Sequence, residues 1–334
     1  MKISASIYSD KKRSLPEVIQ DLINHQVDLL HVDCNDDLSV FEDIKTIRTL
    51  CDIPIDLHVI TEYPSKYYKL LEENPVEYIT FQYEDLKEEL NIPSSVTGQK
   101  GIAVITPTNV NIFKGYNNFD FILIMATIPG QSGGKFDAVN FGKIRSFRNN
   151  FPGKAIHVDG GVNAEVSFIL RNMGVASSVS GSFLFNAPSI GDALLSLTKR
   201  EVESHFAVKD FMIPLEDVPN VQSQNISLEN VLKSIEKGRL GFTLVVDEDN
   251  GMKGLVSNAD VRRALLNHLD DLNSVPGDEL INENPVSIEE DATVNEMLQM
   301  IKRSSFPISY LPVVDQNGFA KGIVTFVNLI KGEL

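Results

Sequence analysis

Residues 154–161 read Lys-Ala-Ile-His-Val-Asp-Gly-Gly, a mainly apolar segment that ends in an acidic residue and a pair of glycines. A short apolar run that is closed by a glycine turn is typical of a buried parallel strand. The first 200 residues contain eight such runs, each ending near a polar or glycine-containing turn, with neighbouring starts about 25 residues apart. We therefore predict strands at Ile3–Ser6, Val27–Asp33, Ile53–Val59, Glu77–Gln82, Lys100–Thr106, Phe119–Ala126, Lys154–Gly160 and Ser177–Ser182.

Helical patterns separate these strands. Ser14 is placed to cap one helix, with Pro16 in its first turn and an apolar face that includes Val18. Eight strands with one helix between neighbours predict an α/β fold, a closed (β/α)8 or TIM barrel. An open doubly wound sheet is the alternative, but it more often has five or six strands and a glycine-rich first turn. Residues 6–10 form the first turn here and contain no glycine.

The composition bounds the class of protein. The chain has 334 residues, 43% of them hydrophobic, which is long for one domain and apolar enough to bury a core. It has no apolar run long enough to span a membrane, and its first residues contain too few apolar side chains for a signal peptide. The two cysteines, Cys34 and Cys51, fit a reducing cytoplasm. A net charge of −16 argues against a nucleic-acid surface.

The last 134 residues form a second unit. They carry −11 of the net charge and contain an internal repeat with an offset of 68 residues. Val-Val-Asp at 245–247 recurs at 313–315, and the Gly-Leu-Val-Ser of 254–257 recurs as Gly-Ile-Val-Thr at 322–325. In each copy a hydroxyl residue, Ser227 or Thr293, is placed to cap a helix. A repeat of this size cannot cover its own apolar face, so we expect the two copies to pack together.

Polar residues at strand ends are the candidates for chemistry, because active groups of a parallel barrel lie at the carboxyl ends of its strands. Alternation along a strand places His31 and Asp33 on one side of the second strand. With His58 and Asp159, they form a set of two imidazoles and two carboxylates that suits one divalent metal ion, Zn, Fe, Mn or Co. Each could also be an ordinary buried or turn residue, and His157, one layer deeper than Asp159, is the residue for which we favour that interpretation.

Glycines follow the sixth, seventh and eighth strands. They lie at residues 130–134, at Gly160-Gly161 and at Gly181, which precedes Ser182. Glycine lets backbone N–H groups approach an anion closely, and the loops after strands 7 and 8 are the usual phosphate site of such barrels. Each group alone is more often a turn, but together they favour a phosphorylated substrate held by backbone rather than by lysines.

These motifs stand in the order seen in ribulose-phosphate 3-epimerases, which residues 1–200 resemble. The residues that carry the resemblance are Ile3–Ile7, His31-Val32-Asp33, Asp56-Leu57-His58, Met125 with Pro129-Gly130 and Gly133, Val158-Asp159-Gly160-Gly161, and Gly181-Ser182 with Phe185. The resemblance implies a metal-dependent sugar-phosphate epimerase of carbohydrate metabolism, acting on ribulose 5-phosphate of the pentose phosphates or on a related ketose phosphate.

The resemblance also implies a role for each matched residue. His31, Asp33, His58 and Asp159 would bind the metal, and Asp33 and Asp159 would also be the acid/base pair. Two carboxylates on opposite faces would remove the C3 proton and return one, through an enediolate that a bound metal stabilises. The substrate-binding residues that it implies are Ser6, Met125, Gly130, Gly133, Gly160, Gly161, Gly181 and Ser182.

The chain departs from the family pattern around the substrate. Asn35-Asp36-Asp37 replaces the family's Met-Asp-Gly, the following loop is shorter, and Ile60 and Ile128 stand where the family has Met and Asn. The residues for metal binding and proton transfer are kept, so the departures concern the identity of the sugar more than the reaction.

The repeated unit resembles a pair of cystathionine-β-synthase (CBS) modules. Gly254–Asp260 fits the family signature, whose hydroxyl and aspartate commonly contact phosphate and ribose. The run after Asp260 looks like modules attached to arabinose-5-phosphate isomerases. A bound adenine nucleotide or sugar nucleotide would therefore contact Ser257 and Asp260, with Thr325 as the counterpart in the second copy, where Asn328 replaces the aspartate. The alternative is that the modules only dimerise the protein.

The sequence thus predicts a cytoplasmic, homo-oligomeric (dimer or higher) ketose-phosphate 3-epimerase with a CBS pair for regulation or assembly. The predicted domains are an epimerase-like barrel at 1–200, a first CBS module at 207–270 and a second, of α+β type like the first, at 276–334. A non-catalytic sugar-phosphate or nucleotide sensor on a degenerate barrel is the alternative. A decarboxylase or aldolase is disfavoured because Lys100 and Lys154 begin strands rather than end them.

Overall fold

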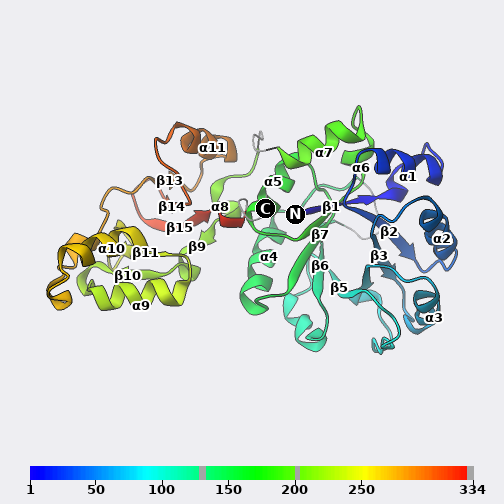
Figure 1. The fold of residues 1–334 in the computed structure, drawn as a ribbon, viewed down its shortest axis with the longest axis horizontal. Helices are drawn as coiled ribbons and strands as arrows, with labels where there is room; N and C mark the ends of the chain where they lie inside the picture. The colour runs from blue at the N-terminus through cyan, green and yellow to red at the C-terminus, as the bar shows by residue number, and fades with distance from the viewer. Residues whose placement is uncertain (128–132, 200–203, 329–334) are drawn as a thin grey trace. The chain divides into compact units, whose positions relative to one another are not determined.

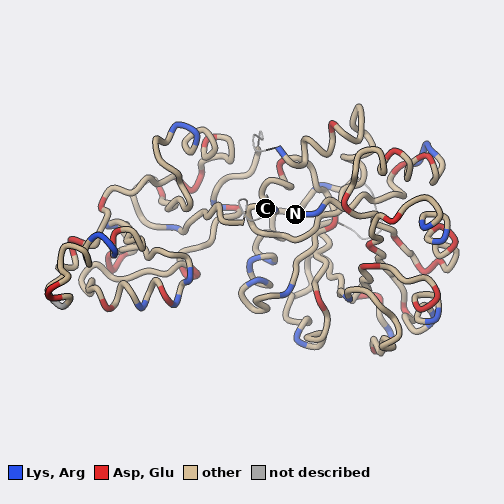
Figure 2. Tube along the Cα trace, in the orientation of Figure 1, with Lys and Arg blue, Asp and Glu red and all other residues tan. Residues whose placement is uncertain are grey.

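The computed structural model describes residues 1–127, 133–199 and 204–328. Within these ranges the chain forms two compact units, residues 1–199 with Asn328 and residues 204–327. In the described part of the chain, no helix has both the length and the apolar content needed to cross a membrane. Acidic and basic residues are interspersed along the trace of both units, so neither charge forms a continuous tract (Figure 2).

The first unit is a closed barrel of eight parallel strands in sequence order, as predicted (Figure 1). Each predicted strand overlaps an observed one. The strands are β1 (Lys2–Ser6), β2 (Leu29–Asn35), β3 (Ile55–Ile60), β4 (Tyr78–Gln82), β5 (Gln99–Ile105), β6 (Phe121–Met125), β7 (Ala155–Asp159) and β8 (Ser177–Ser180).

Helices cover the outside of this barrel (Figure 1). Ser14 is the N-cap of the first one, and its hydroxyl and backbone N–H both donate to the Glu17 carboxylate, at 2.7 and 2.8 Å. The second of these bonds satisfies the backbone N–H of Ser14 at the helix start. The α-helices of the unit are α1 (Leu15–Asn24), α2 (Val40–Leu50), α3 (Ser65–Glu73), α4 (Val139–Asn150), α5 (Ala164–Asn172), α6 (Ser182–Phe185) and α7 (Ile190–Thr198).

The prediction of one helix between all neighbouring strands is wrong in two places. The β4–β5 connection contains the short 3-10 helix η2 (Tyr83–Asp85), and the β5–β6 connection contains η3 (Val110–Tyr116). Another 3-10 turn, η1 (Ile7–Ser9), follows β1. Pro93 and Gly98 interrupt the first connection, and Pro107 and several asparagines the second, so neither sustains an α-helical hydrogen-bond ladder.

The second unit contains two small sheets with the strand orders β10-β11-β12 and β13-β14-β15-β9. Their strands are β9 (Ile213–Pro214), β10 (Asn220–Gln222), β11 (Phe242–Val246), β12 (Met252–Ser257), β13 (Ile288–Glu289), β14 (Tyr310–Val314) and β15 (Ala320–Thr325). The helices are α8 (Val208–Phe211), α9 (Leu228–Gly238), α10 (Asn258–Asn267) and α11 (Val294–Arg303), with 3-10 turns η4 (Leu215–Asp217), η5 (Ser223–Asn225), η6 (Leu272–Ser274) and η7 (Asp278–Leu280).

The two copies of the repeat have the same local structure. The ion pair between Lys253 and Asp247, at 2.9 Å, recurs 68 residues later between Lys321 and Asp315, at 3.0 Å. Ser227 and Thr293 cap α9 and α11, as predicted. One core cluster joins residues of both copies, so the predicted packing of copy on copy is confirmed; its members include Leu244, Leu255, Ala320 and Ile323.

Candidate functional site

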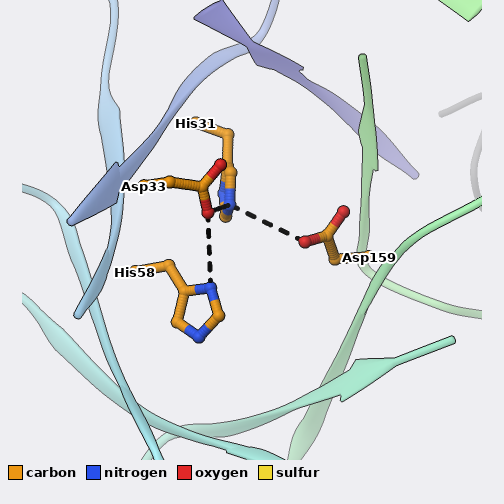
Figure 3. Close-up of side chains that lie close together, drawn as sticks. All are labelled: His31, Asp33, His58 and Asp159. Carbon is orange, nitrogen blue, oxygen red and sulfur yellow. Dashed lines mark hydrogen bonds and ion pairs between the residues drawn. The ribbon is translucent and has the colours of Figure 1, made fainter. Parts of the chain in front are cut away.

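Four side chains converge at the carboxyl ends of three barrel strands (Figure 3). His31 and Asp33 come from β2, His58 from β3 and Asp159 from the last residue of β7. One potential ligand atom from each lies within 4.8 Å of those of the other three. The structure thus brings together the four residues that the sequence singles out.

The two carboxylates approach this centre from opposite sides (Figure 3). His31 Nε2 lies 3.3 Å from Asp33 Oδ1 and 3.9 Å from Asp159 Oδ2. His58 Nδ1 lies 3.6 Å from Asp33 Oδ1. Both imidazoles are fully buried, whereas 18% of each aspartate side chain is exposed, so the carboxylates line the open side of the site.

Burial and mutual charge set the electrostatics of the site. Burial raises the pKa of Asp159 to about 6, and the like charge of Asp33 adds to this effect against the influence of His31. Burial acts against ionisation of Asp33 as well, but His31 outweighs it and holds the pKa of Asp33 well below its usual range. Burial also opposes the charged form of His31, yet Asp33 and Asp56 raise its pKa well above the usual value. The two carboxylates therefore favour a positive charge between them.

The donor set fits a divalent first-row metal ion. Two imidazole nitrogens and two carboxylate groups are ordinary ligands of Zn, Fe, Mn and Co. Among the described residues, the buried Nδ1 of His58 has no hydrogen-bond partner, although it points toward the other three side chains. An unpaired polar atom at this depth is costly unless something binds it, and a metal ion would do so.

Asp56 orients His31, a role that the sequence does not reveal. This buried carboxylate accepts a hydrogen bond from His31 Nδ1 at 2.9 Å and another from Ser4 Oγ at 3.0 Å. His31 and Asp56 are direct cross-strand partners of β2 and β3. The sequence signal was the spacing Asp-x-His at residues 56–58, which places Asp56 and His58 on one face, but the contact with His31 depends on strand register.

His157 lies deeper in the barrel than Asp159 and does not join the four. Its ring stacks on Phe121 with a centroid separation of 4.1 Å, and it faces Tyr78 at 5.5 Å. Burial lowers the pKa of His157 to about 4, so the ring is neutral at pH 7. This packing corresponds to a core residue rather than a ligand.

The glycine pair after β7 packs tightly against the loop after β6. Gly160 and Gly161 have φ angles of +109° and +67°, which favour glycine. A Cβ at Gly160 would lie 2.3 Å from Thr127 Oγ1, and one at Gly161 would lie 2.1 Å from the backbone nitrogen of Phe136. Only residues without a side chain permit this approach of two loops at the barrel mouth.

Of the other predicted substrate-binding residues, those that the structure describes lie at or after the carboxyl ends of barrel strands. Gly181 precedes α6, in which Ser182 is the first residue, and a Cβ at Gly181 would lie 2.2 Å from Ser9 Oγ. That hydroxyl donates to Ser6 Oγ at 3.1 Å. The buried Met125 ends β6 beside Asp159. Gly133 follows in the next loop, whereas Gly130 lies outside the described residues.

In the second unit, Ser257 and Asp260 already bind one another. Ser257 is the N-cap of α10, and its hydroxyl donates to Asp260 Oδ2 at 2.6 Å. Thr325 occupies the corresponding place at the end of β15, opposite Tyr310 in the register. Phe242 is the cross-strand partner of Ser257, and the centroid of its ring lies 4.4 Å from that of Tyr310. The structure thus places the two hydroxyl residues at equivalent ends of the two copies.

Comparisons with known proteins bear on both units. Residues 2–185 match the model of the ribulose-phosphate 3 epimerase family, and residues 208–267 and 277–333 match that of the CBS domain. The second unit is therefore a CBS pair.

Two relatives of the first unit are similar over nearly their whole length. The ribulose-phosphate 3-epimerase of Methanocaldococcus jannaschii is 30% identical over 227 residues, 64% of this chain and 95% of the relative. The cytoplasmic isoform of Oryza sativa subsp. japonica is 26% identical over 212 residues, 59% of this chain and 93% of the relative. Among solved structures, CBSX2 in complex with AMP is 25% identical, covers 38% of this chain and 96% of its own, and has a TM-score of 0.32.

Proposed function

This chain belongs to the ribulose-phosphate 3-epimerase family of isomerases, and we propose that it inverts C3 of ribulose 5-phosphate or a related ketose phosphate. One observation carries the proposal: Asp33 and Asp159 face each other across a centre that also contains two imidazoles. Inversion next to a ketone needs a base on one face of the carbon and an acid on the other.

The reaction uses the two aspartates in alternate roles. One carboxylate takes the proton from C3, and the electron pair left behind is delocalised onto the C2 carbonyl oxygen to give an enediolate. The other carboxylate donates a proton to the opposite face of C3, and the carbonyl re-forms. The roles exchange in the reverse direction.

His31, Asp33, His58 and Asp159 would hold one divalent metal ion, Zn, Fe, Mn or Co. When bound, it would supply Lewis-acid polarisation of the substrate oxygens. Asp56 fixes the ring of His31. Gly160, Gly161, Gly181 and Ser182 would hold the phosphate through backbone N–H groups, since glycine lets an anion approach the backbone closely. Ser6, Met125, Gly130 and Gly133 would contact the remainder of the substrate.

The CBS pair would regulate activity or assembly in response to an adenine nucleotide or sugar nucleotide, in a homo-oligomer of two or more chains. Ser257, Asp260 and Thr325 are the proposed contacts. The likeness of this pair to modules of arabinose-5-phosphate isomerases stays a prediction from sequence. So do the cytoplasmic location, which the two free cysteines fit, and the domain bounds 1–200, 207–270 and 276–334, of which residues 200 and 334 lie outside the described ranges.

The test of the epimerase combines metal analysis with isotope exchange. The purified chain would be incubated in heavy water with ribulose 5-phosphate and with a panel of other ketose phosphates. We expect about one bound metal ion per chain and deuterium at C3 of at least one compound, with its epimer as product. Metal-free protein that catalyses no exchange after addition of Zn, Fe, Mn or Co would favour the non-catalytic sensor.

A further inference from the structure

A chain of hydrogen bonds leads outward from His58 through β4. The last residue of that strand is Gln82, whose side chain is buried, and His58 Nε2 lies 2.9 Å from Gln82 Oε1. Gln82 Nε2 donates in turn to the carboxylate oxygen Oε2 of Glu84. The imidazole that faces the four-residue centre is thus joined to an acidic residue at the surface.

The carboxylate of Glu84 determines which way the Gln82 amide points. Its Oε1 accepts hydrogen bonds from the backbone N–H of Ile105, at 3.1 Å, and from the hydroxyl of Thr108. An ionised carboxylate only accepts hydrogen bonds, so Oε2 requires a donor from Gln82. If the Gln82 amide were rotated by 180°, its carbonyl oxygen would face the Glu84 carboxylate, and two acceptors cannot form a hydrogen bond.

The orientation of Gln82 then determines where His58 carries its proton. Because the carbonyl oxygen of Gln82 faces Nε2, that nitrogen must be the donor, and neutral His58 has its N–H at Nε2. Nδ1 is left with a lone pair, at the nitrogen that has no hydrogen-bond partner among the described residues and lies 3.6 Å from Asp33 Oδ1. A histidine can bind a metal ion only through a nitrogen without a proton.

The ring of His31 is oriented by a direct contact with a carboxylate. Its Nδ1 donates to the buried Asp56 carboxylate, so Nε2 is the nitrogen that faces Asp33 and Asp159. The two imidazoles therefore have different hydrogen-bond partners. His31 is bound by the Asp56 carboxylate, whereas His58 is bound by the Gln82 amide, which is itself bound by the Glu84 carboxylate.

We propose that Gln82 and Glu84 are positioning residues that fix the tautomer of His58, so that Nδ1 faces the centre ready to bind a metal ion. This inference rests on the proposed metal site but concerns residues outside it. It predicts that a change at exposed Glu84 alters the proton position on a fully buried ring with which it has no direct contact.

Glu84→Gln is the decisive variant, because it replaces one oxygen by an NH2 group. The Ile105 N–H and the Thr108 hydroxyl would keep their hydrogen bonds to the remaining side-chain oxygen of residue 84, so the new NH2 group would face Gln82. Gln82 would then turn its oxygen toward residue 84 and its NH2 toward His58 Nε2. We expect His58 to change from the Nε2–H to the Nδ1–H tautomer, and the affinity for Zn²⁺ to fall by roughly 10- to 100-fold, as for other changes behind metal ligands.

The tautomer would be measured in the full-length, metal-free chain labelled with ¹⁵N-histidine, by long-range ¹H–¹⁵N correlation at pH 8. A His58→Asn sample assigns the resonances. Zn²⁺ affinity would be measured by competition with a chromophoric chelator. Gln82→Met, which removes the amide at similar volume, should give mixed tautomers and a similar loss of affinity.

Two control variants separate the chain of hydrogen bonds from general effects. Asp85→Asn removes a negative charge beside Glu84, and Thr80→Val removes a buried hydroxyl that has no hydrogen-bond partner among the described residues, on the strand that ends at Gln82. Both should keep the Nε2–H tautomer and a Zn²⁺ affinity within twofold of the unaltered chain.

Each outcome is decisive. If Glu84→Gln keeps the Nε2–H tautomer and a Zn²⁺ affinity within twofold, the inference is overturned while the metal site stands. If Gln82→Met fails to fold, Glu84→Gln alone decides. If the unaltered chain has the Nε2–H tautomer, Glu84→Gln reverses it, and neither binds a metal ion, the positioning role is upheld and the proposed metal-dependent function fails.

Discussion

Asp33 and His58 are cross-strand partners of β2 and β3, and a single oxygen, Asp33 Oδ1, lies 3.6 Å from His58 Nδ1 and 3.3 Å from His31 Nε2. Asp159 Oδ2 lies 3.9 Å from His31 Nε2, and a ligand atom of Asp159 lies within 4.8 Å of one of His58. The two carboxylates are therefore not equivalent, although the proposed reaction needs one on each face of the substrate. Their substitutions should give different and complementary defects.

The first prediction concerns Asp33→Asn and Asp159→Asn. Each variant retains one carboxylate, so each should still remove the C3 proton from the epimer that presents it to that residue. We expect epimerisation to fall about 10²- to 10⁴-fold in both, as for loss of a general acid or base. Each should still exchange C3 hydrogen with heavy water, one variant with the starting epimer and the other with the product epimer.

The measurement is NMR of both epimers in heavy water, with saturating metal and with metal content determined for each variant. An asparagine oxygen can still bind a metal ion, so loss of metal can be distinguished from loss of the base. If one fully loaded variant epimerised at the normal rate, the assignment of two bases would be wrong.

The second prediction concerns metal binding and stability. A metal ion that binds only the folded barrel stabilises it by mass action, about 2.7 kcal/mol at a concentration 100 times its Kd. We expect Zn²⁺ or Mn²⁺ to raise the unfolding temperature of the chelator-treated barrel, and the shift to disappear in His31→Ala and His58→Ala. Differential scanning calorimetry would resolve the barrel from the CBS pair.

The matched control for these variants is His268→Asn. His268 pairs with Glu279 in the second unit, at 2.7 Å, and is not one of the four residues of the centre. Its replacement should leave the metal-induced shift unchanged. A shift that persists in both His31→Ala and His58→Ala would place the metal elsewhere.

The third prediction tests the phosphate role of the loop after β7. A Cβ at Gly160 would contact Thr127 Oγ1 at 2.3 Å and Thr127 N at 2.8 Å, so Gly160→Ala must displace the loop. Loss of one hydrogen bond to a charged group costs about 1.5–3 kcal/mol, so KM should rise tenfold or more. Steady-state kinetics over a range of ketose phosphate concentrations would measure it.

Gly153→Ala is the control at the opposite end of the same strand. Gly153 has a φ of +89°, and a Cβ there would have open space. Both variants should lose about 1–3 kcal/mol of stability from backbone strain, but only Gly160→Ala should raise KM. An equal KM for the two variants would mean that this loop does not bind the phosphate.

The strands of the barrel are predictable because each is buried on both faces. Their ends are predicted to within two residues, since each apolar run gives way to a polar or glycine-containing turn. Strand alternation also correctly places His31 with Asp33. Closure of the barrel then brings His58 and Asp159 to the same centre, so alternation together with the position at strand ends was enough to choose the four residues.

The groups that orient these four residues could not be found in this way. The contact of Asp56 with His31 depends on strand register, which a single sequence does not specify. Gln82 looks like an ordinary polar residue at a strand end, and its role depends on the direction of an amide that Glu84 determines. Hydrogen-bond direction leaves no periodic signal in a sequence.

The fourth prediction separates capping from nucleotide binding in the CBS pair. Ser257 and Thr293 are both N-caps with reciprocal partners, Asp260 and Glu296 respectively. Replacing either by alanine should lower the free energy of unfolding by about 1 kcal/mol, because each loses one capping hydrogen bond.

Of these two caps, Ser257 alone is a proposed ligand contact. AMP or ATP should therefore raise the unfolding temperature of the unaltered chain and of Thr293→Ala, and this rise should be lost in Ser257→Ala. Thermal shift with each nucleotide would measure it, and sedimentation velocity would report assembly. An equal rise in both variants would place the nucleotide away from Ser257, whereas no rise in the unaltered chain, together with a sedimentation coefficient of a dimer, would mean that the modules serve assembly alone.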